Sequence, residues 1–270
     1  LDADQMIQAH TLLPLYAHFL SSRRRRAATA AMLNVGAGSP VKFVGGRFVV
    51  ANPGVLRLCL KCVMEDQTRY GRAYWHRIHQ APGAIVCPHH GVMLTKTSIT
   101  CTGARRTKKF VDARDAEHQG PVAEALTSRD FAIATASVET FQRLMERHPP
   151  LHTPSALRCA LRAVLAERGY VARENGLQMG RLHEDFSSWL SPGLAQALGI
   201  PQPLIPSGAS WLCRLLTRNQ ENIAPLAAVL TAMFLNVDFM EILGRAETPV
   251  SHPRKSHKVC LLYTSPSPRD

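Results

Sequence analysis

Four residues in one stretch of the chain have the types and the spacing of a metal site. Cys59 and Cys62 form a Cys-x-x-Cys pair, and Cys87 and His90 repeat the same two-residue gap after residues 63–86. Thiolates are soft ligands that suit zinc, and three sulfurs with one imidazole nitrogen form a closed tetrahedral site. The spacing therefore predicts one structural Zn²⁺ held by Cys59, Cys62, Cys87 and His90.

Other donors lie close to these four in the sequence. His89 precedes His90, although the two-residue gap favours His90, and Cys101 is an alternative sulfur ligand. His76 and His79 lie between the two ligand pairs, and we interpret them as surface or packing residues. Tyr74 and Trp75 are interpreted as core residues of the finger rather than as base-stacking groups.

The predicted site is structural rather than catalytic. A closed four-ligand site leaves no open position for an activated water. The zinc deaminase pattern, His-x-Glu followed by Pro-Cys-x-x-Cys, does not occur in the sequence. A metal-dependent nuclease is the enzymatic alternative, but Asp112, Asp115, Glu184 and Asp185 form no recognisable catalytic set. We therefore expect a protein that is not an enzyme.

The whole chain is strongly basic. It has 270 residues, with 32 Lys and Arg against 20 Asp and Glu, and its formal net charge is +12. Such a charge favours a polyanionic partner, which we expect to be double-stranded DNA. The candidate contacts are Arg23, Arg24, Arg25, Arg26 and Arg181. For the run of four arginines, a solvated helix face is the alternative interpretation, and the sequence slightly favours it.

Composition also bears on the compartment. No apolar run approaches the ~20 residues of a membrane span, and the N-terminus lacks the layout of a signal peptide. The cysteines are irregularly spaced, which favours metal binding in a reducing cytosol over a disulfide framework. Cys159 and Cys213 fall on helical stripes and are expected to be small core residues. We expect a cytoplasmic, nucleoid-associated bacterial protein with no membrane partner.

The pattern of apolar residues predicts a mainly α-helical fold with a small Cys₃His zinc finger. The second half is rich in Leu and Ala, which favour helix. Residues 154–190 resemble a helix-turn-helix-like region, in which Thr153 and Pro154 begin the first helix and Gly169 ends it. The other expected elements are helical segments at 4–20 (broken by Pro14), 22–34, 192–199, 210–218 and 223–243, a hairpin at 41–50, and a polar linker at 102–120.

Residues around the predicted site also resemble a known family. The stretch "NPGVLRLCLKCVMEDQTRYGRAYWHRIHQAPGAIVCPHHGVML" is similar to the finger region of the TniQ/TnsD family. The shared pattern has an arginine before the first cysteine pair, a "YW…HQ" segment, a Pro-Gly and Cys-Pro-x-His-Gly-x-x-Leu. "HTLLPLYAHFL" upstream and "ERGYVARENG" and "LHEDFSSWLSPGLAQALG" downstream resemble the same family. The resemblance covers about residues 8–245 and favours the TnsD-like branch.

The resemblance implies a function in transposition. Proteins of this family select the insertion site of heteromeric transposons and recruit an AAA+ regulator of the TnsC kind. TnsD-like members bind an attachment site on DNA, whereas TniQ members recruit from an RNA-guided effector complex. Tyr70, Arg72, Arg77 and His79, between the ligand pairs, are the candidate partner-binding residues. The alternative is a generic zinc-finger regulator or adaptor with no role in transposition.

These observations predict a division of the chain. We expect an N-terminal helical segment with a small hairpin at 1–50, a TniQ-type zinc finger at 51–103 and a helical domain at 104–258. Residues 259–270 include "CLLYTSPSPRD", which resembles a translated sequencing adapter, so we expect a scar there. The start at Leu1 and this tail lead us to expect a fragment cut at both ends.

Overall fold

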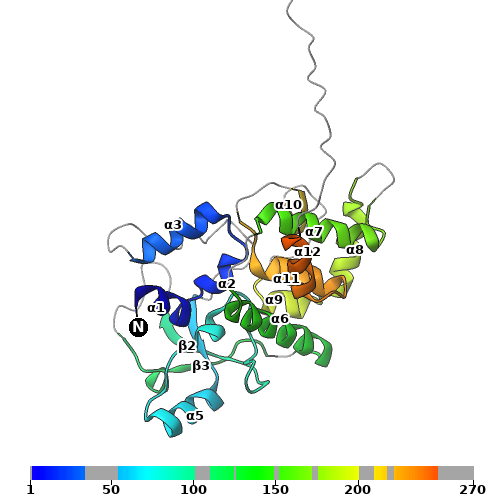
Figure 1. Ribbon diagram of the computed structural model, residues 1–270. Helices are drawn as coiled ribbons and strands as arrows, with labels where there is room; N and C mark the ends of the chain where they lie inside the picture. The colour runs from blue at the N-terminus through cyan, green and yellow to red at the C-terminus, as the bar shows by residue number, and fades with distance from the viewer. Residues whose placement is uncertain are drawn as a thin grey trace, which may run out of the picture.

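A small antiparallel sheet and a larger group of helices make up the fold. The computed structural model describes residues 2–33, 54–100, 110–124, 126–148, 152–171, 176–200, 210–217 and 222–248. Figure 1 shows the sheet and helix α5 at the lower end of the molecule in this view, with helices α6 to α12 gathered beside them. The mainly helical class predicted from the sequence is confirmed.

Three short helices form the N-terminal part. They are α1 (Ala3–His10), α2 (Leu13–Ala17) and α3 (Ser22–Leu33). Asp2 and Gln5 form a capping box at the start of α1, and Pro14 lies in the first turn of α2. Because proline lacks the N–H that a helix interior needs, it divides the segment where the sequence predicted. The predicted hairpin at 41–50 lies outside the described residues.

The sheet has three antiparallel strands in the order β1-β2-β3. They are β1 (Val55–Leu58), β2 (Thr95–Thr100) and β3 (His118–Pro121). Between β1 and β2 lie helix α5 (Leu60–Tyr70) and the 3-10 helix η1 (Arg77–Gln80). The expected polar linker at 102–120 is corrected in its described part, which contains the 3-10 helix η2 (Ala113–Asp115) and most of β3.

Two of the remaining helices begin at a capping side chain and are followed by a glycine with positive φ, as the sequence predicted for Thr153 and Gly169. The side chains of Thr153 and Ser191 accept hydrogen bonds at the starts of two helices, and Gly169 and Gly199 have positive φ just after the ends. The expected helical segment 223–243 divides at Asn236, whose φ is +53°. The helices are α6 (Ser128–Glu146), α7 (Pro154–Glu167), α8 (Met179–Trp189), α9 (Pro192–Ala197), α10 (Trp211–Thr217), α11 (Pro225–Phe234) and α12 (Phe239–Glu247).

Both helices of the expected helix-turn-helix-like region are present, as α7 and α8. A helix-turn-helix joins its helices by a turn of about 3–4 residues, whereas residues 168–178 separate these two. Helix α7 packs against α12 and α10. A helix-turn-helix function for these helices therefore stays a prediction.

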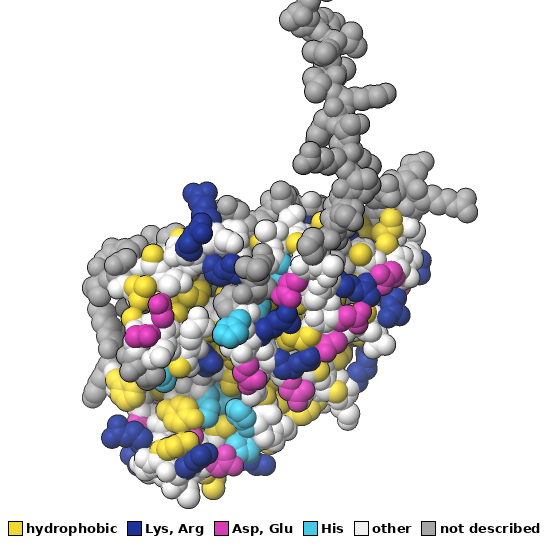
Figure 2. Space-filling view, in the orientation of Figure 1, with side chains coloured by type: hydrophobic (Ala, Val, Ile, Leu, Met, Phe, Trp, Pro, Cys, Tyr) yellow, Lys and Arg dark blue, Asp and Glu magenta, His cyan; other side chains and the backbone are white. Residues whose placement is uncertain are grey.

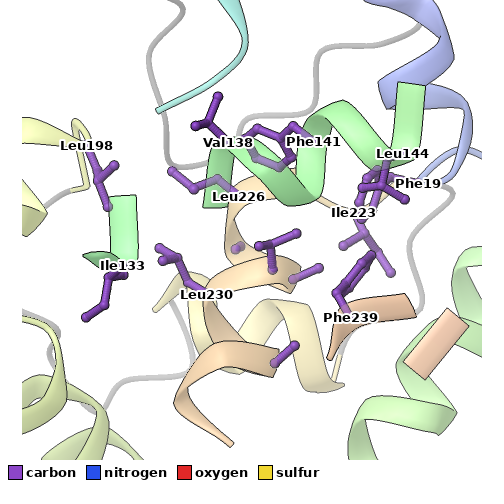
Figure 3. Packing of buried hydrophobic residues seen from close by; sticks show 14 of the residues in the cluster. Phe19, Ile133, Val138, Phe141, Leu144, Leu198, Ile223, Leu226, Leu230 and Phe239 are labelled. Carbon is purple, nitrogen blue, oxygen red and sulfur yellow. The ribbon is translucent and has the colours of Figure 1, made fainter. Parts of the chain in front are cut away.

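One hydrophobic cluster runs from the N-terminal part through the segment between β1 and β2 to the last helix. It includes Phe19, Cys59 and Ile85 as well as Phe141 of α6 and Leu226 of α11. Figure 3 shows Val138 and Phe141 facing Leu226, with Phe19 and Phe239 on the other side of the same core. Described residues on both sides of residue 103 share this core. The predicted boundaries at 50, 103 and 258 stay predictions.

Among the described residues, no single helix is long and apolar enough to cross a membrane. By length and composition alone, one strongly bent pair of helices, Pro225–Phe234 and Phe239–Glu247, passes the same test.

Candidate metal centre

The structure brings the four predicted ligands together. Their donor atoms all lie within 4.8 Å of one another. His90 Nδ1 lies 3.3 Å from Cys62 Sγ and 3.6 Å from each of Cys59 Sγ and Cys87 Sγ, and the sulfurs of Cys62 and Cys87 are 3.6 Å apart. Three sulfurs and one nitrogen thus surround a common centre.

Local backbone structure fixes each pair of ligands. Cys59 directly follows β1 and is the N-cap residue of α5. Cys62 lies in the first turn of that helix. The second pair lies on a tight turn in which the N–H of Cys87 donates to Val92 O and that of Gly91 donates to Cys87 O. Gly91 has φ +58°, which glycine adopts without strain.

The arrangement fits a tetrahedral metal ion. Zn–S and Zn–N distances of about 2.3 and 2.0 Å at tetrahedral angles place sulfurs about 3.8 Å apart and sulfur about 3.5 Å from nitrogen. The observed separations are close to both values. The donor set is also the soft one that zinc prefers. The Cys₃His group could therefore form a zinc site, and it suggests a bound metal.

The electrostatics of the three thiols lead to the same conclusion. A hydrogen bond from the Cys62 thiol lowers the pKa of Cys87, and that same bond raises the pKa of Cys62. Burial is the largest cause that raises the pKa of Cys59. The protein alone therefore accommodates one thiolate but resists three, and a divalent cation would remove that conflict.

A glutamate orients the histidine ligand. His90 Nε2 donates a hydrogen bond to Glu65 Oε1 at 2.8 Å, while Nδ1 faces the sulfurs. Glu65 lies on α5, one turn after Cys62. A carboxylate behind a ligating histidine fixes its tautomer and ring orientation. Glu65 was not among the residues predicted from the sequence, although its spacing of three residues from Cys62 on a helix places both on one face.

Two further residues of the family pattern have structural roles beside the site. Arg57 is buried, and its guanidinium donates to Ala84 O and, at 2.8 Å, to Ala81 O. The Arg57 N–H donates to Gln80 Oε1 at 3.0 Å, and Gln80 Nε2 donates to Arg57 O at 2.6 Å. These contacts hold the segment before Cys87 against β1.

Four rings form a ladder from the metal site to the surface, which we call the ring ladder: His79, His76, Tyr74 and Tyr70. Successive ring centroids are 4.9, 4.3 and 6.1 Å apart. His79 is 1% exposed, Tyr74 48% and Tyr70 55%. The interpretation of Tyr74 as a core residue was therefore wrong. Trp75 is half-buried, and its Nε1–H donates to Val111 O at 2.8 Å.

The candidate partner-binding residues differ in exposure. Tyr70 and Arg72 are exposed. His79 is buried, with Nε2 3.9 Å from Cys62 Sγ, so it cannot be the exposed anchor that was expected. Arg77 is half-buried and donates to the backbone oxygens of Gln8 and Thr11, which ties η1 to α1.

The other candidate donors lie apart from the cluster. The side chain of His89 is exposed and its ring lies 6.2 Å from that of His76. Cys101 lies outside the described residues. Cys159 is exposed and Cys213 half-buried, so the expectation that both are core residues is corrected.

The candidate DNA-binding arginines lie on two helices. Arg23 and Arg26 of α3 are exposed, and Arg24 and Arg25 are half-buried. Arg181 of α8 is exposed, lies 3.6 Å from the carboxylate of Asp185 and has its guanidinium over the ring of Tyr170.

Comparisons with known proteins agree with this site. The TniQ family model matches residues 1–94, which contain all four ligands. Over 91 residues the chain is 35% identical to the transposon Tn7 transposition protein TnsD of Escherichia coli. That match covers 33% of this chain and 18% of TnsD, so the aligned part is less than a fifth of the relative's own length.

Fold, site and matches together define a TniQ domain with a Cys₃His cluster. The matches support a TniQ/TnsD-family protein and agree with the resemblance found in the sequence over residues 1–94. The matches support a transposition-associated protein.

Proposed function

We propose that this protein selects the target site of a heteromeric transposon: it binds duplex DNA and recruits an AAA+ regulator of the TnsC kind to the insertion site. The observation that carries the proposal is the TniQ match over residues 1–94, together with the geometry of the four ligands inside it. The net charge of +12 supports the DNA partner.

The proposed role makes and breaks no covalent bond. The protein holds two partners, DNA and the AAA+ regulator, and the metal centre makes a small segment rigid enough to present a surface. Tyr70 and Arg72 are the proposed anchors for the regulator, because both are exposed and belong to residue types common in interface hot spots. A TniQ-like variant of the proposal has an RNA-guided effector complex deliver the DNA.

We propose that the metal is a single structural Zn²⁺ held by Cys59, Cys62, Cys87 and His90. Binding of zinc contributes on the order of 10 kcal/mol to the folding of small fingers. These side chains join the start of α5 to the turn at 87–90. Since the three cysteines also belong to the main hydrophobic cluster, loss of the ion would loosen the adjoining core.

Substitution of Cys62→Ser should abolish metal binding, because it removes one of four ligands from the cluster. The measurement is elemental analysis of protein purified without chelator, with circular dichroism to follow the fold. Cys159→Ser is the matched control, because Cys159 is exposed and outside the cluster. Wild-type protein and the control should carry one zinc per chain. Wild-type protein without zinc would refute the assignment.

The function itself is tested by recruitment. The AAA+ regulator encoded beside the intact reading frame is captured on tagged protein, with and without attachment-site DNA. Association that Arg72→Ala weakens, while zinc and DNA binding persist, supports the proposal. If the two proteins never associate although zinc and DNA are bound, the protein is a regulator or adaptor outside transposition.

A further inference from the structure

An aromatic groove lies beside the metal centre. It encloses about 680 Å³ between α1, the segment after α5 and α6. Its lining includes Tyr70, Tyr74 and Trp75, with His10 of α1 and Gln142 and Glu146 of α6. Figure 2 shows histidine and hydrophobic side chains gathered in the region of α5 and α6. The proposed zinc ligands do not line this groove.

The ring ladder ends in this groove. His76 stacks on Tyr74 with centroids 4.3 Å apart and planes 22° from parallel, and its Nε2 donates to the buried Asp66 at 2.9 Å. The hydrogen bond to Asp66 therefore fixes the inner end of the stack, whereas Tyr74 and Tyr70 are about half-exposed at its outer end. A ring system held in this way can accept one further flat ring at low entropic cost, because its own rings are already positioned.

Charge at the groove favours a polyanionic ligand. Arg69 lies at its edge, with its guanidinium 5.2 Å from the centroid of the Tyr70 ring, whereas Arg77 of the lining adds positive charge while its guanidinium donates to the backbone oxygens of Gln8 and Thr11. Glu146 is the one acidic residue among the lining residues. Aromatic rings beside positive charge are typical of single-stranded nucleic acid sites, in which bases stack on aromatic side chains and phosphates face cations.

The groove is less suited to a helical peptide. Helix-in-groove recognition uses a continuous hydrophobic groove that accepts the apolar face of an amphipathic helix. Here the aliphatic lining is limited to Ala9, Ile78 and Met145, and the rest is aromatic or polar. Gln142 and His10 offer the donors and acceptors that the edge of a base would need.

We propose that the aromatic groove binds an unpaired nucleobase, by stacking on Tyr74. The base belongs either to DNA, as a flipped-out or unpaired nucleotide at the target, or to RNA; the stacking chemistry is the same for both. This inference deepens the proposed nucleic-acid binding and rests on it. It gives the finger a role in reading distorted or single-stranded nucleic acid, beside the duplex contacts of the arginines.

The test compares Tyr74→Ala and Tyr74→Phe with the wild-type chain. The probes are a single-stranded oligodeoxythymidine, an RNA of equal length, a blunt duplex, and the same duplex with one unpaired base. Loss of a base–aromatic stack should weaken binding of the unpaired probes by about 5- to 150-fold in Tyr74→Ala, whereas Tyr74→Phe keeps its ring and its affinity. The stronger of the two single-stranded probes identifies DNA or RNA as the source.

Controls separate this result from other causes. Phe110 is 79% exposed and does not line the groove, so Phe110→Ala should leave every affinity unchanged. Zinc content and blunt-duplex binding should also persist in Tyr74→Ala. Photo-cross-linking of a bromouracil-containing strand, mapped by mass spectrometry, should label Tyr70, Tyr74 or Trp75 and does not depend on a variant that folds.

Three outcomes would overturn the inference. They are wild-type protein that binds no unpaired probe, a Tyr74→Ala variant that binds as tightly as wild type, and cross-links outside the groove. Tyr74→Ala that loses recruitment of the AAA+ regulator but keeps binding of unpaired bases would make the groove a protein-docking site. Failure of the proposed function is separate, since it would appear as lost recruitment by the wild-type chain.

Discussion

Glu65 is the residue on which the orientation of the metal ligand His90 depends. Its carboxylate accepts from His90 Nε2 at 2.8 Å, which leaves Nδ1 to face the sulfurs. Outer partners of this kind typically change metal affinity by about 10- to 100-fold. Glu65→Ala should weaken zinc binding by that factor, and Glu65→Gln should weaken it less because the amide oxygen still accepts.

Competition with a chromogenic chelator measures this loss. Glu184→Ala is the control, because Glu184 is exposed on α8 and away from the cluster. If both Glu65 variants bind zinc as tightly as the wild-type protein, the hydrogen bond has no role in ligand positioning. The ligand set alone then determines the zinc affinity.

At the scale of elements, two buried histidines join three segments. His18, which follows α2, donates from Nε2 to Leu144 O of α6 at 2.9 Å. His152, before α7, donates from Nε2 to His18 O at 3.0 Å. Burial is the main cause that lowers the pKa of both rings, and that of His18 falls from 6.5 to about 4, with Arg25 and Arg147 adding to the effect.

This junction should make stability depend on pH. Since the folded-state pKa of His18 lies below the unfolded value, the unfolded chain binds more protons between pH 6.5 and about 4. The free energy of unfolding should be highest above pH 6.5 and fall by about 3 kcal/mol as pH decreases through this window. Urea unfolding at several pH values measures it. His18→Gln keeps a donor without the titration and should flatten the profile; an unchanged slope would contradict this origin.

The same elements show what the sequence could predict. Both ligand pairs and the caps at Thr153 and Ser191 depend on neighbours a few residues apart, so their patterns were readable. The exposure of Tyr74 and Cys159 and the burial of His79 depend on which segments pack together far along the chain. β3 was missed because the polar run His118–Pro121 pairs through its backbone and buries little.

At the scale of the whole molecule, Gly83 joins the metal-binding part to the helices. It has φ +70°, and a Cβ added there would lie 2.5 Å from Leu226 Cδ2 on α11. Leu226 is itself buried in the core (Figure 3). Gly83→Ala should therefore lower the free energy of unfolding by about 2 kcal/mol or more, through backbone strain and overpacking.

Gly71 provides a matched control for this prediction. Its φ is +73°, but an added Cβ would meet no atom within 4 Å. Gly71→Ala thus carries the backbone strain without the clash, and the difference between the two variants in urea unfolding isolates the contact with Leu226. Equal losses in both would mean that the finger and α11 are not tightly packed in solution.

The net charge of +12 is a property of the whole chain, and it predicts how the protein should bind duplex DNA. Each phosphate contact releases counterions, so the logarithm of affinity should fall linearly with the logarithm of salt concentration, with a slope of about −0.9 per contact.

Replacing Arg23, Arg24, Arg25 and Arg26 by alanine should reduce the magnitude of that slope by up to about 4, and Arg181→Ala by about 1. Arg143 and Arg245, which pair with Asp238 and with Glu167 and Glu241 and are not candidate contacts, are the comparison residues, and their replacement should leave the slope nearly unchanged. Fluorescence anisotropy across a salt series measures all of these slopes. Affinity that is absent at low salt, or independent of salt, would show that the positive charge of this protein serves a partner other than DNA.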